Sequence, residues 1–195
     1  MRKLLFLFAL LLISFFAKSQ DFDELSYVEM DSLMMVYYQG HAYEKGVELT
    51  NYAINRAKIE FGSDSVSAEY TSWGGFFCEL LGNYQEALPL YEETAAMFKA
   101  ALGEESLMYT AALNNIANTH SKLNNDSKAK SIYFKELAIR EKYHGKEDPG
   151  YAICLNDIGV LYQKKEQYSD AVKMYKEALV IQAKVLGTMN YTYAN

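Results

Sequence analysis

The residues that could carry out catalysis or hold a metal ion are few and widely separated. They are the histidines His41, His120 and His144 and the cysteines Cys78 and Cys154. Zinc and similar metals take their ligands at short, regular spacings, and these five residues show none. The sequence also has no phosphate-binding glycine loop, nucleophile elbow or zinc motif. We therefore expect no catalytic residue, no metal site and no cofactor, and we predict that the chain is not an enzyme.

The composition is that of a globular, helical protein. Of its 195 residues, half are hydrophobic, and only two, Pro89 and Pro149, are proline. Acidic residues outnumber basic ones by 25 to 19, for a net charge of −6. Binding to nucleic acid needs a basic face, so this balance argues against a nucleic-acid partner.

The first nineteen residues have the layout of a secretory signal peptide. The basic head Met1-Arg2-Lys3 precedes an apolar run from Leu4 to Ala17, and Ala17-Lys18-Ser19 offers a cleavage site. The run is shorter than the roughly 20 residues that span a bilayer. We predict cleavage between Ser19 and Gln20 and export to the periplasm or the extracellular space. The alternative is an uncleaved membrane anchor.

The rest of the chain repeats with a step of 42 residues. Three series keep this step, namely Ala87, Ala129 and Ala171; Tyr91, Tyr133 and Tyr175; and Gly103, Gly145 and Gly187. Each copy predicts two helices, since apolar residues recur at spacings of three and four and the copies end in glycine. Asp148-Pro149 suits a helix start. The expected helices are 24–39, 43–61, 65–81, 84–102, 106–122, 127–143, 149–165 and 168–186.

Small residues at equivalent positions indicate close packing between paired helices. Gly75, Ala117 and Gly159 share one place in the first helix of each pair, and the three alanines share one in the second. Helices approach closely only where no large side chain intervenes.

The cysteines lie on the third and seventh helices, about 20 Å apart, and a disulfide needs Cα atoms within about 7 Å. We expect two free, buried thiols, and we expect His120 to be a packing residue.

This small–small–aromatic pattern resembles the tetratricopeptide repeat, in the 42-residue variant of kinesin light chains and many bacterial proteins. Leu113–Ala117 and Leu155–Gly159 match the phrase of its first helix. The resemblance implies an all-α, right-handed superhelical solenoid of antiparallel helix pairs. After a lead-in at 20–29, the implied pairs are 30–62, 63–103, 104–145 and 146–187, and 188–195 would start a further repeat.

The resemblance also implies a concave groove, lined by the first helices, that binds a protein or peptide. The implied partner-binding residues are Ser72, Trp73, Phe76, Asn114, Asn115, Asn118, Asn156, Asp157, Val160 and Gln163. An asparagine amide both donates and accepts hydrogen bonds, so it can hold a peptide backbone. Alternatively, the asparagines bridge neighbouring helices and Trp73 is packed between the second and third helices. Basic residues are sparse on this face, with Lys122 and Lys164 nearest, which favours a neutral or basic partner.

The sequence thus predicts an exported scaffold or sensor module. The alternative is the N-terminal regulatory arm of a longer protein with an enzymatic domain beyond Asn195, for which the resemblance suggests a caspase-like (CHAT) peptidase or a sensor kinase. Apolar residues of the last pair, Val172, Tyr175, Leu179 and Val185, leave self-association through the C-terminal end as a further hypothesis.

Overall fold

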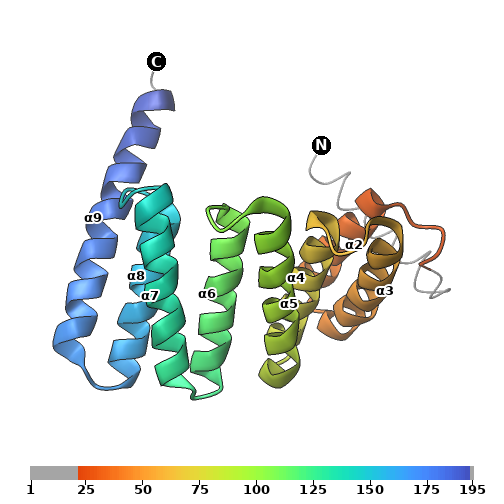
Figure 1. Cartoon of the computed structure of the whole chain (residues 1–195), viewed down its shortest axis with the longest axis horizontal. Helices are drawn as coiled ribbons and strands as arrows, with labels where there is room; N and C mark the ends of the chain where they lie inside the picture. Colours follow the sequence, from red (N-terminus) through yellow and green to blue (C-terminus); the bar gives the residue numbers. More distant parts are fainter. Residues whose placement is uncertain (1–21, 194–195) are drawn as a thin grey trace.

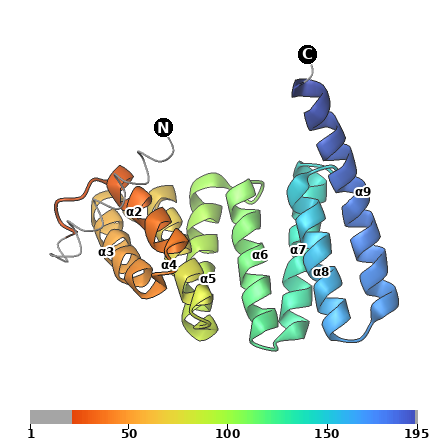
Figure 2. The ribbon, with the colours of Figure 1, turned by 180° about the vertical axis from the view of Figure 1, so that it is seen from behind.

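The computed structural model describes residues 22–193, which form eight α-helices and no β-strand. The helices form a row of antiparallel pairs, in which each helix packs against the next one in the sequence and α6 also contacts α8 (Figure 1). Figure 2 shows the same row from behind. The predicted all-α solenoid is confirmed. The helices are α2 (Tyr27–Gln39), α3 (Tyr43–Phe61), α4 (Ser65–Leu80), α5 (Tyr84–Leu102), α6 (Leu107–Lys122), α7 (Asp126–Tyr143), α8 (Pro149–Lys164) and α9 (Tyr168–Tyr193).

Capping side chains begin the first helix of each pair. Asp64, Ser106 and Asp148 accept hydrogen bonds from backbone N–H groups in the first turns of α4, α6 and α8. Pro149 is the first residue of α8, where its missing N–H needs no partner. Gly145, which follows α7, has a φ of 82°, a conformation that glycine adopts readily. The predicted helix start at Asp148-Pro149 and the predicted helix end near Gly145 are therefore confirmed.

Paired helices touch where the sequence has its smallest residues. A Cβ atom built on Gly75 of α4 would lie 2.8 Å from the Tyr91 ring of α5. A Cβ atom on Gly159 of α8 would lie 2.6 Å from the Tyr175 ring of α9. Both distances are shorter than a carbon–carbon contact allows. The predicted close packing of these pairs is confirmed.

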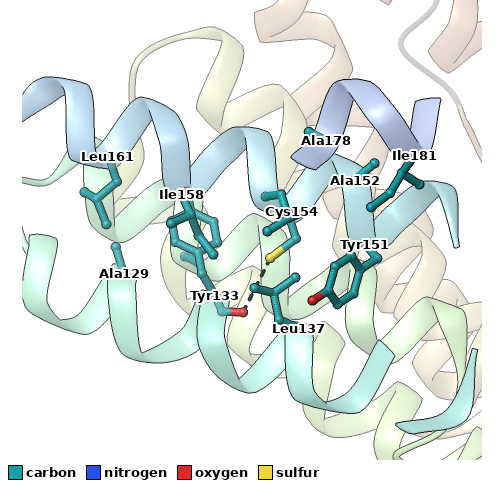
Figure 3. Close-up of a cluster of buried hydrophobic side chains, with 12 residues drawn as sticks. Ala129, Tyr133, Leu137, Tyr151, Ala152, Cys154, Ile158, Leu161, Ala178 and Ile181 are labelled. Atoms are coloured by element: carbon teal, nitrogen blue, oxygen red, sulfur yellow. Dashed lines mark hydrogen bonds between the residues drawn. The ribbon is translucent and has the colours of Figure 1, made fainter. Parts of the chain in front are cut away.

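The hydrophobic core consists of three clusters of buried residues along the row, and the partly buried Val47 and Ile132 link each cluster to the next. Figure 3 shows its C-terminal part, where Tyr133 and Leu137 of α7 pack against Cys154 and Ile158 of α8. Burying a side chain of this size contributes about 1.5–3 kcal/mol. No helix within residues 22–193 combines the length and the apolar character that crossing a bilayer requires.

The last helix differs from the prediction. We expect a helix end near Gly187, but α9 continues through it to Tyr193 and extends beyond the other helices in Figure 1. Glycine costs only about 1 kcal/mol inside a helix, so it need not end one. The other predicted helices agree with the observed ones to within a few residues. The predicted signal peptide, residues 1–19, lies outside the described residues, and the predicted repeat boundaries remain a prediction.

Candidate functional site

A cavity of about 410 Å³ opens between α4 and α6. We call it the aromatic cavity, and its size falls in the ~300–1,000 Å³ range of ligand pockets. It contains four of the residues predicted to bind a partner, Ser72, Trp73 and Phe76 of α4 and Asn115 of α6. Sequence analysis missed the rest of its lining because no motif marks these positions: Glu69, Phe98, Met108, Ala111 and Ala112.

The wall of the aromatic cavity on α4 is a cluster of aromatic rings in edge-on and tilted contacts. Trp73 meets Phe76 edge-on, with centroids 5.7 Å apart, and lies 5.8 Å from Phe77. Phe76 also meets Tyr38 of α2 at 5.4 Å. Phe77 is fully buried, whereas Trp73 and Phe76 are partly exposed. The sequence predicts that Trp73 either binds a partner or packs between helices. It lines the cavity and also packs against the core, so it is placed for both roles.

Three polar groups of the aromatic cavity have no partner within the part of the chain that the structure describes. The hydroxyl of Ser72 and the amide of Asn115 make no hydrogen bond among the described residues. Glu69 likewise has no hydrogen bond or ion pair there. Partial burial raises the pKa of Glu69, and the like charges of Asp31 and Asp64 raise it further. A ligand could therefore gain hydrogen bonds and charge pairing that the fold itself leaves unused.

A second cavity, of about 470 Å³, lies between α6 and α8, and we call it the polar cavity. It contains the predicted residues Asn118, Asp157 and Val160. Lys122 and Lys164 also line it, and these are the two basic residues that the sequence places nearest to the predicted groove. The remaining lining residues are Ser121, Asn124 and Tyr133.

Asn114 and Asn118 are held by bonds inside the protein. Asn114 Nδ2 donates to Glu136 Oε2 of α7 at 3.1 Å and to Asp157 Oδ2 of α8 at 2.9 Å. Asn118 Nδ2 donates to Asn114 Oδ1 at 2.9 Å, and its own oxygen accepts from the Tyr133 hydroxyl. These two asparagines follow the alternative prediction, in which they bridge neighbouring helices.

The two remaining predicted residues of α8 line neither cavity. Asn156 is exposed and makes no hydrogen bond among the described residues. Gln163 is exposed, and its side-chain oxygen accepts from the Tyr175 hydroxyl of α9 at 2.9 Å. Of the four predicted asparagines, Asn115 and Asn156 are thus the ones available to a ligand.

A buried ionic cluster joins α7 to α8, and sequence analysis missed it. Arg140 Nε donates to Glu136 Oε1 at 2.7 Å, and Arg140 Nη1 donates to Asp148 Oδ2 at 2.8 Å. Glu136 is 1% exposed, and burial raises its pKa despite the arginine. Burial also raises the pKa of Asp157. The spacing of four between Glu136 and Arg140 was a signal for the pair, but that spacing is just as common on exposed helix faces.

Both thiols and one of the three histidines are buried, whereas His41 and His144 are exposed. Cys78 and Cys154 are free, as predicted, and burial raises the pKa of both thiols. Cys154 Sγ donates to the Tyr133 carbonyl oxygen at 3.4 Å (Figure 3). His120 is 5% exposed, as expected of a packing residue, and burial lowers its pKa. Within the described part of the chain, no three His, Cys, Asp or Glu residues are grouped to hold a metal ion.

The comparison with family models identifies the repeat. The tetratricopeptide repeat model matches residues 67–141 and 131–184, which together make up more than half of the chain. No curated protein matches the chain.

Solved structures with this fold have low sequence identity to the chain. BtubC from P. vanneervenii superposes with a TM-score of 0.71 at 22% identity, over 80% of this chain and 61% of its own. The nearly identical TPR-like repeats of Podosopora anserina, described as a kinesin light chain, give 0.69 at 20% identity, over 81% and 75%. MamA gives 0.51 at 19% identity, over 81% and 91%. The chain therefore spans about three-fifths of the length of BtubC, and these likenesses establish the fold alone.

Proposed function

The chain belongs to the tetratricopeptide repeat family, and we propose that it is a scaffold or sensor module that binds a protein or peptide partner. The face involved carries the aromatic cavity and the polar cavity, and we call it the first-helix face. The observation that carries the proposal is the aromatic cavity, where partly exposed rings lie beside polar groups that have no partner among the described residues. Binding sites combine apolar surface with a few such polar groups.

The free asparagines supply the second part of the proposal. Asn115 and Asn156 occupy neighbouring first helices, α6 and α8, and neither amide makes a hydrogen bond with residues 22–193. Each amide can accept a backbone N–H and donate to a backbone carbonyl of an extended peptide. Partner binding in this mode depends little on the partner's side chains, which suits a scaffold.

The test is a double substitution, Asn115→Ala with Asn156→Ala. We expect it to weaken capture of the native partner from the organism's own cells, measured by quantitative mass spectrometry, by roughly 30-fold, since the loss of each asparagine amide costs about 1 kcal/mol. The matched control is Asn51→Ala with Asn55→Ala, which removes two exposed amides from α3. If capture survives the first pair as well as it survives the control, the first-helix face is the wrong surface.

We further propose that the module acts by binding and not by catalysis. The thiols are buried and their raised pKa values keep them protonated near neutral pH, whereas a nucleophilic cysteine needs an exposed thiolate. Export follows as a proposal from the residues before Gln20.

A further inference from the structure

The aromatic cavity has a defined shape and an uncompensated charge. One wall is formed by the Trp73 and Phe76 rings, and the facing wall of α6 has Met108 beside the small residues Ala111 and Ala112. Phe98 of α5, 4% exposed, adds a buried ring to the lining. An apolar side chain entering here would exchange contact with water for contact with rings and methyl groups, which favours binding.

We propose that the aromatic cavity binds a partner peptide that presents one large apolar side chain with a lysine or arginine within a few residues of it. The apolar side chain would fill the space between Trp73 and Ala111, and the cation would pair with the Glu69 carboxylate. Ser72 and Asn115 would hold the peptide backbone. This inference rests on the proposed function and names the chemistry of the partner at one part of the first-helix face.

The charge of the partner follows from the helices around the cavity. The helix α4 contains Glu69 and Glu79 and no basic residue, and α2, whose Asp31 accepts from the Tyr70 hydroxyl of α4, adds Glu29 and Asp31. The basic residues of the other lining helices are engaged or distant, since Lys99 of α5 pairs with Glu104, and His120 and Lys122 lie in the last turn of α6. Asp31 and Asp64 lie near enough to Glu69 to raise its pKa, and no cation offsets them. An acidic peptide would be repelled by this group, whereas a basic one would be attracted and would also relieve the repulsion between the carboxylates.

The polar cavity is lined by basic residues, whereas the aromatic cavity is lined by an acidic one, so the charge changes sign along the first-helix face. Lys122 and Lys164 both line the polar cavity, and Lys164 Nζ already donates to Asp126 Oδ1 at 2.9 Å. The basic residues of the face are thus gathered at the α6–α8 end, about one repeat from Glu69. A peptide that places its cation in the aromatic cavity avoids these lysines, so its direction along the face is set by charge.

The experiment is selection from a phage library of random eight-residue peptides on the purified chain. We expect enriched sequences to carry an aromatic residue, leucine or methionine within four residues of lysine or arginine. Trp73 is the only tryptophan of the chain, so its fluorescence reports on the cavity directly. A synthetic copy of the most enriched peptide that lacks tryptophan should shift the Trp73 emission, and added salt should weaken its binding.

Two substitutions separate shape from charge. Ala111→Phe places a ring in the cavity from an exposed helix position, so it should block the peptide at least 10-fold while the Tm stays within a few degrees. Its control is Ala100→Phe at an exposed position of α5. Glu69→Gln should weaken binding about 3-fold, the scale of one partly exposed ion pair. Its control is Glu92→Gln, an exposed carboxylate of α5.

The outcomes also distinguish this inference from the function on which it rests. Enriched peptides that pair the apolar residue with acidic residues would overturn it. So would peptides that bind the Ala111→Phe variant normally but lose binding in the Asn115→Ala/Asn156→Ala variant, although the first-helix face would then stand. If no peptide is enriched over a column without protein, both the inference and the proposed peptide-binding function fail.

Discussion

At the residue scale, neighbouring glycines of α4 have different roles. A Cβ atom on Gly75 would lie 2.8 Å from the Tyr91 ring, which is itself 1% exposed and cannot move away. A Cβ atom on Gly74 would lie 3.3 Å from Ile54 Cδ1, the end of a flexible side chain. Only Gly75 is thus required by the packing of α4 against α5, whereas Gly74 weakens the helix without a comparable steric need.

We predict that Gly75→Ala destabilises the protein by about 1–3 kcal/mol, the usual cost of overpacking a core. Gly74→Ala should leave stability unchanged or raise it by up to about 1 kcal/mol, because alanine is the better helix former. Urea unfolding followed by circular dichroism measures both, and each variant is the other's control. Equal effects of the two substitutions would contradict the packing argument.

At the element scale, α6, α7 and α8 are joined by polar groups as well as by apolar packing. Asn114 of α6 bonds both Glu136 of α7 and Asp157 of α8, and Arg140 continues the network to Asp148. Such networks stabilise only while every member is paired, because an unpaired buried charge is costly. The stability of the contact between α6–α7 and α8 therefore depends on the protonation of its carboxyl groups, whereas the stability of purely apolar contacts does not.

We predict that Asp157→Asn stabilises the protein at neutral pH by about 1 kcal/mol, the usual scale of a single substitution. Burial raises the pKa of Asp157 above its ordinary value of 3.8, so the folded state binds this proton more tightly than the unfolded state does. The carboxyl therefore favours folding at low pH, and that contribution is lost as the pH rises through the folded pKa. Asparagine keeps an oxygen that accepts from Asn114 and carries no charge.

Urea unfolding at pH 4 and at pH 7.5 measures this effect. The gain from Asp157→Asn should be small at pH 4 and full at pH 7.5, whereas Glu177→Gln, at an exposed carboxylate of α9, should show little change between them. A loss of stability at pH 7.5 would mean that the ionised carboxylate of Asp157 stabilises the contact between α6–α7 and α8.

At the scale of the whole molecule, the outer face of α9 differs from the surfaces between repeats. Val172, Leu179 and Val180 are 47%, 65% and 57% exposed. Ala171, the small residue on the side of α9 that packs against α8, is buried. A patch of exposed apolar residues indicates contact with another surface. Self-association remains a hypothesis that light scattering tests, since a mass that rises with concentration would support it and a constant mass would contradict it.

We predict that the native polypeptide begins at Gln20, because the residues before it have the layout of a cleaved leader. Intact mass and N-terminal sequencing of the protein from its own cells measure this. A start at Met1 would contradict cleavage and favour the anchor. A mass matching residues 20–195 would support a self-contained scaffold, and a much larger mass would support the alternative of a regulatory arm attached to an enzymatic domain.

The sequence by itself determined the helices, their pairing and their family. A 42-residue step repeated three times is a long, redundant signal, and each helix start is encoded locally by a capping residue such as Asp64 or Asp148. The contacts between Gly75 and Tyr91 and between Gly159 and Tyr175 could also be predicted, because they recur in register. Gly187 misled the prediction because glycine permits a helix end without requiring one.

Only the tertiary structure decided which polar residues are free. Asn114 and Asn115 are adjacent in the sequence, but on a helix they point about 100° apart. The first therefore faces Glu136 and Asp157 and is fully used, whereas the second faces the aromatic cavity. Whether a polar side chain finds a hydrogen-bond partner depends on residues of other helices. The partners of Asn114 lie 22 and 43 positions away in the sequence, and they meet it only when the helices pack together.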